Sequence, residues 1–206
     1  MVELCVKRYP QLDVCREDIL RAIETVIACY ETGGKVLICG NGGSSADSEH
    51  ISGELMKGFL KKRPLSGKRR AEMLKNMPQA AELLESLQEG LAAIPLPSFM
   101  SLNSAFGNDV DPSMIYAQGV LALAKPGDIL LSITTSGNSQ NVVNASLIAK
   151  ALGVTVIALT GETGGKIKCI ADVCIRVPAS ETYQVQELHL PVYHTICAAV
   201  EEHFYD

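Results

Sequence analysis

The chain has 206 residues, a formal net charge of −5 and a pI of about 5.4. Its acidic balance, its lack of Trp and its aromatic content of 5% exclude the usual nucleic-acid-binding surface, which combines basic side chains with stacking rings. A chain of this length is long enough to bury the core of one sheet and its covering helices.

Targeting and redox signals indicate a protein of the cytoplasm. The first ten residues carry charges where a secretory signal would be apolar, and no apolar run approaches the roughly 18 residues of a membrane span. The seven cysteines are an odd number without C-x-x-C spacing, which is typical of free, buried thiols in a reducing compartment. We therefore expect a soluble, cytoplasmic protein with no membrane or nucleic-acid partner.

Expected helices and strands alternate along the chain. Apolar residues recur at helical spacing in residues 16–32, and Gly33-Gly34 ends that helix. Apolar runs such as residues 129–134 are typical of parallel strands that are buried on both faces. The expected strands are residues 35–39, 92–95, 128–134, 154–160 and 173–177. The expected helices are residues 16–32, 44–59, 71–90, 98–105, 112–124, 139–152 and 181–204, with a turn at 107–109.

This order predicts an α/β fold, a three-layer αβα sandwich around a parallel sheet of about five strands, with long helices near both ends of the chain. One domain over residues 1–206 is the simplest organisation, with an inserted basic loop and helix at about 60–90. The basic residues around the start of this insertion form either a solvated loop or a lid that reaches an anionic substrate. They are Lys57, Lys61, Lys62, Arg63, Lys68, Arg69 and Arg70.

Two loops at the ends of expected strands have the composition of phosphate-binding loops. Residues 40–45 read Gly-Asn-Gly-Gly-Ser-Ser, and residues 134–139 read Thr-Thr-Ser-Gly-Asn-Ser. In open parallel sheets, ligands bind beyond the carboxyl ends of the strands, and helix N-termini favour anions there. Neither loop contains Lys or Arg, which suits a small phosphate monoester better than a nucleotide triphosphate. An ordinary Ser/Gly turn is the alternative for either loop alone.

The sequence contains no complete nucleotide-binding motif of the dinucleotide or P-loop type. The dinucleotide pattern G-x-G-x-x-G would need glycine at position 45, where Ser45 stands. Residues 161–166 resemble a P-loop that is one residue short, and Ile167 replaces its magnesium-binding hydroxyl. We expect a turn at 161–166 and no nucleotide cofactor.

Two expected helices carry groups that move protons or bind metal. His50 and Glu54 are four residues apart and therefore share one helix face. Gln186 and His194 are eight residues apart on the last helix, with Pro191 between them, and lie on roughly one side. The four side chains suit either a zinc site or a metal-free acid and base.

With these residues in view, the chain resembles the SIS (sugar isomerase) domain, and within it the phosphoheptose isomerase family. The matching stretches are C-G-N-G-G-S-S-A-D-S-E-H-I-S-G-E-L, G-N-D, T-T-S-G-N-S, A-L-T-G-x-x-G-G and Q-E-L-H-L-P-V-Y-H, which occur in the family's order. The resemblance implies an SIS-type, flavodoxin-like fold. It also implies isomerisation of sedoheptulose 7-phosphate to a D-glycero-D-manno-heptose 7-phosphate through an enediol.

The resemblance also assigns residues. It makes Glu54 the catalytic base and His194 the acid, and it implies one zinc ion per subunit bound by His50, Glu54, Gln186 and His194. It implies a homotetramer with sites at subunit interfaces. The implied substrate contacts are Asn41, Gly42, Gly43, Ser44, Glu54, Asn108, Asp109, Thr134, Thr135, Ser136, Ser139 and Gln186.

Three departures from the family pattern keep alternatives open. Gly58 stands where the family has Arg, Thr134 stands where Ser is usual, and the stretch around 62–90 resembles an insertion. The chain is therefore either a heptose phosphate isomerase, an isomerase of another ketose phosphate, or a non-catalytic member that senses phosphosugars or binds a replication initiator. Glu54 and His194, which the adaptor type lacks, favour an enzyme.

Overall fold

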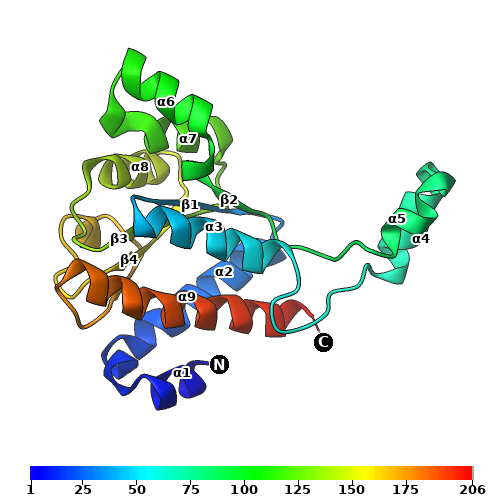
Figure 1. Cartoon of the computed structure of the whole chain (residues 1–206), viewed down its shortest axis with the longest axis horizontal. Coiled ribbons are helices and arrows are strands. Elements are labelled where there is room, and N and C mark those ends of the chain that lie inside the picture. The colour runs from blue at the N-terminus through cyan, green and yellow to red at the C-terminus, as the bar shows by residue number, and fades with distance from the viewer. Residues whose placement is uncertain (206) are drawn as a thin grey trace.

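The computed structural model describes residues 1–205 and centres on a five-stranded parallel sheet (Figure 1). The strand order is β2-β1-β3-β4-β5, and every neighbouring pair is parallel. The strands are β1 (Val36–Gly40), β2 (Ala93–Pro95), β3 (Ile129–Thr134), β4 (Thr155–Thr160) and β5 (Val173–Arg176). The predicted α/β fold with five parallel strands is therefore confirmed.

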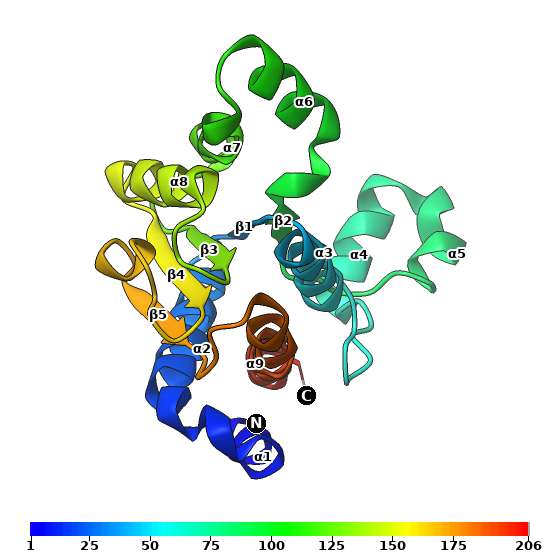
Figure 2. The ribbon, with the colours of Figure 1, turned by 60° about the vertical axis from the view of Figure 1, so that its left-hand side comes forward.

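Helices cover both faces of the sheet (Figure 2). The α-helices are α1 (Val2–Arg8), α2 (Arg16–Glu31), α3 (Gly43–Met56), α4 (Gly67–Asn76), α5 (Ala81–Leu84), α6 (Met100–Asp109), α7 (Ile115–Leu123), α8 (Gln140–Ala151) and α9 (Thr182–Phe204). Short 3₁₀ segments lie at Pro10–Cys15, Pro78–Ala80, Leu96–Ser98, Pro112–Met114 and Ile167–Cys169. None of the helices within residues 1–205 is long and apolar enough to cross a membrane.

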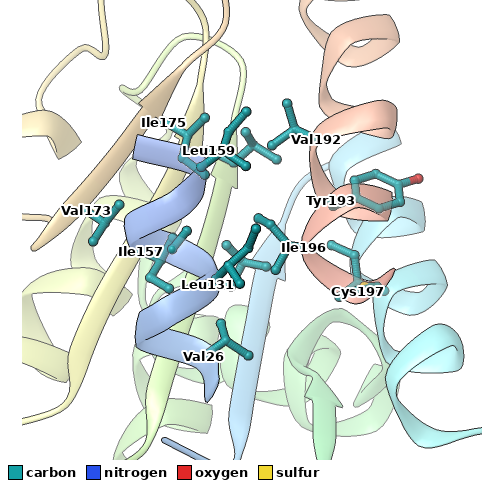
Figure 3. Close-up of a cluster of buried hydrophobic side chains, with 14 of the residues drawn as sticks. Val26, Leu131, Ile157, Leu159, Val173, Ile175, Val192, Tyr193, Ile196 and Cys197 are labelled. Atoms are coloured by element: carbon teal, nitrogen blue, oxygen red, sulfur yellow. The ribbon is translucent and has the colours of Figure 1, made fainter. Parts of the chain in front are cut away.

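Alternate side chains of each strand enter two separate cores. Val36 and Ile38 pack with α1, α2, α3 and α9 on one face, whereas Leu37 and Cys39 pack with α7 and α8 on the other. Figure 3 shows part of the first core, where side chains of α2, the sheet and α9 meet. All seven cysteines are free, and five of them are buried.

The sheet places two strand ends together at the point where the strand order reverses. The chain passes from β1 outward to β2 and then returns to β3 on the other side of β1. Cys39 pairs with Ser132 and Gly40 with Ile133, so β1 and β3 end side by side. Crevices at such reversal points are the usual ligand sites of open parallel sheets.

The insertion is an arm that projects from the body (Figure 1). Its base is a short stem, in which Pro64 bridges to Gln88 and the backbone N–H of Glu89 donates to the Arg63 carbonyl at 2.7 Å. The predicted single helix over 71–90 is wrong, because α4 begins at Gly67 and ends at Asn76. Proline restricts the residue before it to extended conformations and has no N–H, and Pro78 therefore separates α4 from the short α5.

The turn predicted at 107–109 is also wrong. Gly107, Asn108 and Asp109 lie in the last turn of α6. The chain turns after them, where the Asp111 carboxylate accepts a hydrogen bond from the Ser113 backbone N–H at 2.7 Å and Pro112 opens a 3₁₀ turn. Proline fixes the backbone of this turn more strongly than glycine does.

Candidate active site

A polar cavity of about 310 Å³ lies at the ends of β1 and β3. Both predicted phosphate-binding loops contribute to it, and so does the first part of α9. The lining residues are Asn41, Gly42, Gly43, Ser44, Ile133, Thr134, Thr135, Ser139, Thr182 and Gln186. The N-terminus of α3 opens into this cavity, and neither α3 nor α8 is capped by a side chain. Exposed helix N–H groups and hydroxyl donors together suit a phosphate group.

The first loop is held from two sides. The Tyr116 hydroxyl donates to the Gly40 carbonyl at 2.7 Å, and the side-chain amides of Asn41 and Asn141 exchange hydrogen bonds at 2.8 and 2.9 Å. A Cβ at Gly43 would lie 2.5 Å from Nε2 of Gln186, so a larger residue there would displace the end of the Gln186 side chain from the loop. These contacts fix the start of α3 against α8 and α9.

The second loop is packed against the turn at 161–165. Gly137 has a φ of +68°, and a Cβ there would lie 2.2 Å from the Gly164 carbonyl oxygen. The expected turn is present, and no P-loop forms. Within the loop, Thr134 Oγ1 donates to Ser139 Oγ at 3.1 Å, and both residues line the cavity. Ser136 does not line it, and its hydroxyl accepts the Asn138 backbone N–H at 3.2 Å.

The proton-moving side chains lie further along the α3–α9 pair. Nε2 of His50 lies 3.3 Å from Glu54 Oε1 and 3.4 Å from Nε2 of His194. Lys57 Nζ lies 3.1 Å from the other Glu54 oxygen, Oε2. Two distant segments of the chain therefore converge, as the sequence predicted. Burial and the neighbouring His50 lower the pKa of His194, which favours its neutral imidazole.

Gln186 connects this cluster to the cavity. It lines the cavity directly, and two helical turns, about 12 Å of α9, separate it from His194. His194 itself lines a different hollow, an apolar groove of about 480 Å³ between α1, the segment after α3, and α9. One copy of the chain therefore presents an anion cavity and an acid–base cluster at two levels of the same helix pair.

Some predicted contacts lie elsewhere. Asn108 and Asp109 are exposed at the end of α6, where the Asn108 amide donates to the Asp109 carboxylate at 2.8 Å, and neither lines the cavity of its own copy. Sequence reasoning missed Ile133, Thr182, Asn141 and Tyr116. Ile133 and Thr182 carry no sequence signal of a site. Asn141 does carry one, because it is a polar residue in the first turn of α8.

The donor set suits zinc, but it is not assembled as a closed metal site. Zinc bonds of about 2.0–2.1 Å in a tetrahedron put neighbouring donor atoms about 3.3–3.4 Å apart. The distances from His50 to Glu54 and to His194 match this spacing. Within residues 1–205, however, no three His, Cys, Asp or Glu side chains form a ready metal-binding group, and Gln186 lies against Gly43.

Most of the basic residues around the insertion are bound to the protein itself. Arg63 pairs with Glu201, Arg69 with Glu89, and Arg70 with Glu85. Lys57 pairs with Glu54, and Lys61 Nζ donates to the Tyr205 carbonyl at 2.8 Å. These interactions stabilise the insertion and the segment after α3. No residue of the arm lines the cavity of the same copy.

Comparisons with known proteins agree with this geometry. A family model described as the SIS domain matches residues 11–89 and 88–161. A phosphoheptose isomerase of Methylibium petroleiphilum is 42% identical over 192 residues, which are 92% of this chain and 84% of the relative. The chain belongs to the phosphoheptose isomerase family of SIS-domain proteins.

Solved structures of the family share the fold at full length. The phosphoheptose isomerase from Francisella tularensis superposes with a TM-score of 0.78 at 31% identity. The one from Neisseria gonorrhoeae superposes with a TM-score of 0.77, also at 31% identity. Each comparison covers 97% of this chain and 94% of the other.

Proposed function

We propose that the chain is an aldose–ketose isomerase that interconverts sedoheptulose 7-phosphate and a D-glycero-D-manno-heptose 7-phosphate through an enediol. The observation that carries the proposal is the meeting of Glu54, His50 and His194 on the same helix pair that borders the hydroxyl-lined cavity. The separation of the two levels suits a substrate whose phosphate and reacting carbons lie at opposite ends.

The phosphate would bind in the cavity to Ser44, Thr135 and Ser139 and to the N-terminus of α3. Glu54, whose side chain is 13% exposed, would remove the proton from one carbon and return it to its neighbour. A neutral His194 can donate to or accept from the substrate oxygens while that proton moves. Positioned acids and bases of this kind each contribute about 10²–10⁴-fold to the rate.

We also propose zinc as a resident ion, bound by His50, Glu54, Gln186 and His194. The spacing of three of these donors supports the proposal, and Gln186 would have to turn from Gly43 toward them. A bound zinc ion would polarise the carbonyl and stabilise an enediolate. Elemental analysis of protein purified without added metal tests whether zinc is resident. Full activity of metal-free protein would contradict the zinc proposal.

Assembly into a homotetramer is a further part of the proposal, and so is a cytoplasmic location, which the free cysteines support. The groove beside His194 is lined by exposed apolar side chains, including Leu4, Leu60 and Leu190, which a second copy would cover. Residues 57–90 carry eight basic and four acidic side chains, a net +4, while the rest of the chain is −9. Light scattering on the purified protein measures the assembly, and a monomer with full activity would contradict sites shared between subunits.

The decisive experiment assays C5 to C7 ketose phosphates for isomerisation, with and without a chelator. We expect turnover of sedoheptulose 7-phosphate above that of the shorter sugars, and its loss in the Glu54→Gln variant. Tight binding of a sugar phosphate without turnover by the wild type would instead identify a sensor and contradict the enzyme.

A further inference from the structure

A buried tyrosine lies directly behind the acid–base cluster. Tyr193 precedes His194 on α9 and is 2% exposed, and its ring packs at the edge of the core beside α9. Its hydroxyl points away from the sheet toward α3 (Figure 3). There it lies 3.2 Å from Asp47 Oδ1 and 3.1 Å from Nδ1 of His50.

The hydrogen-bonding capacity of these groups fixes the direction of the chain of bonds. A tyrosine hydroxyl has one proton to donate, and an ionised carboxylate can only accept. The Tyr193 hydroxyl therefore donates its hydrogen bond to Asp47 Oδ1, and the Tyr193 oxygen accepts one from Nδ1–H of His50. In the opposite tautomer, Nδ1 of His50 would itself need the Tyr193 hydroxyl proton, and Asp47 Oδ1 would lose its donor. Asp47 Oδ2 is already buried without a partner within residues 1–205, so the carboxylate would then have none from Tyr193.

This direction determines what His50 presents to the site. With its proton on Nδ1, neutral His50 has a lone pair on Nε2. That lone pair faces Glu54 Oε1 at 3.3 Å and Nε2 of His194 at 3.4 Å. Glu54 Oε1 also accepts, so these two acceptor atoms need a donor between them, either Nε2–H of His194 or another electrophile.

We propose that Tyr193, held by Asp47, is a positioning residue that sets the tautomer of His50 and so makes its Nε2 an acceptor in the site. The proposal deepens the isomerase function and rests on it only for its kinetic readout. Tyr193 touches neither substrate nor reacting atoms in this scheme; it acts through His50.

The test compares Tyr193→Phe with Tyr30→Phe. Tyr30 is the control, because it is a half-buried tyrosine whose hydroxyl donates to the Ala92 carbonyl at 3.1 Å, away from the cluster. The ring ¹⁵N shifts of the four histidines, recorded on chelator-treated protein and assigned with His50→Gln, report the tautomer. We expect the Nδ1–H form in the wild type and in Tyr30→Phe, and its loss in Tyr193→Phe.

Kinetics provide the second readout. Tyr193→Phe should lower kcat by about tenfold with KM changed less than about twofold, the lower end of the 10–100-fold range for partners that orient a histidine of a site. Asp47→Asn retains an acceptor for the Tyr193 hydroxyl, so its kcat should fall less than that of Tyr193→Phe. It also provides the test if Tyr193→Phe fails to fold. An unchanged His50 tautomer in Tyr193→Phe overturns the inference. If the wild type isomerises no sugar phosphate, the proposed function fails, and the ¹⁵N shifts still decide the role of Tyr193.

Discussion

Two carboxylates of the α3–α9 pair, Glu201 and Glu54, lie in opposite situations. Glu201 and its partner Arg63 have no exposed side-chain surface, and Glu201 accepts from the Arg63 Nε and from the backbone N–H groups of Phe59, Leu60 and Lys61. Glu54 meets His50 and the exposed Lys57, and the His50 side chain is 44% exposed. One carboxylate is fully satisfied by donors, whereas the other is not.

The contrast separates a structural carboxylate from a reactive one. Arg63 also donates to the carbonyls of Leu55 and Glu54 at 2.7 and 3.1 Å, so it closes the last turn of α3. The buried Glu201–Arg63 pair therefore anchors the backbone that carries Glu54. Removing either partner of a buried ion pair of this kind lowers the stability of the fold. A substitution in a half-exposed cluster leaves stability nearly unchanged and lowers only the activity.

Glu54→Gln should have the largest effect on activity and little effect on folding. Without a basic carboxylate, kcat should fall by about 10²–10⁴-fold, while phosphosugar binding survives. Steady-state kinetics together with calorimetric binding of the sugar phosphate measure both quantities. Undiminished turnover would show that Glu54 is not the base.

Glu201→Gln should invert that pattern. The substitution leaves the Arg63 guanidinium buried without its counter-charge, which costs about 3–5 kcal/mol of unfolding free energy. Urea unfolding measures the loss, and kcat per folded molecule should stay near that of the wild type. Glu202→Gln, at the exposed neighbouring residue, is the control and should change stability by less than about 0.5 kcal/mol. Equal effects of the two variants would refute the anchoring role.

His189 should make folding sensitive to acid. It is fully buried, neither ring nitrogen has a hydrogen-bond partner within residues 1–205, and burial lowers its pKa from 6.5 to about 4. Because the unfolded chain binds the proton more readily, the contribution to stability is full above pH 6.5 and is lost as pH falls toward about 4. Between about pH 7.5 and pH 5 the loss should be about 2 kcal/mol.

Urea unfolding at the two pH values measures this loss. The His189→Gln variant should have a smaller pH dependence than the wild type. A wild-type slope in His189→Gln would assign the acid sensitivity to other groups.

The smallest effect should come from the two serines of the second loop. Ser139 lines the cavity, so Ser139→Ala should raise KM by about 5–10-fold, the value of one typical hydrogen bond. Ser136→Ala should raise it less, because the Ser136 hydroxyl is outside the cavity lining and bonded to Asn138. Steady-state KM values for both variants test the order, and a larger effect at Ser136 would reverse the assignment.

Sequence reasoning was most successful where a residue's role depends on the position of its strand or helix. The alternation of apolar runs predicts five parallel strands, and the loops after β1 and β3 then meet because of the strand order. The pairing of His50 with Glu54 follows from helical spacing alone. The insertion could not be predicted in the same way, because α4 buries none of its residues and local proline chemistry decides where it ends. The roles of Tyr193 and Tyr116 depend on contacts between distant segments, which patterns within a single sequence do not describe.

The stem of the arm has a consequence for how this chain can vary. The two chain segments of the stem meet at Pro64 and Gln88, and the arm beyond them adds only Leu84 to the buried residues. A loop whose ends already touch can be shortened, lengthened or exchanged without moving the body to which it is attached. The residues between these two segments are thus a natural attachment point, at which evolution or an engineer can graft a new module onto this scaffold.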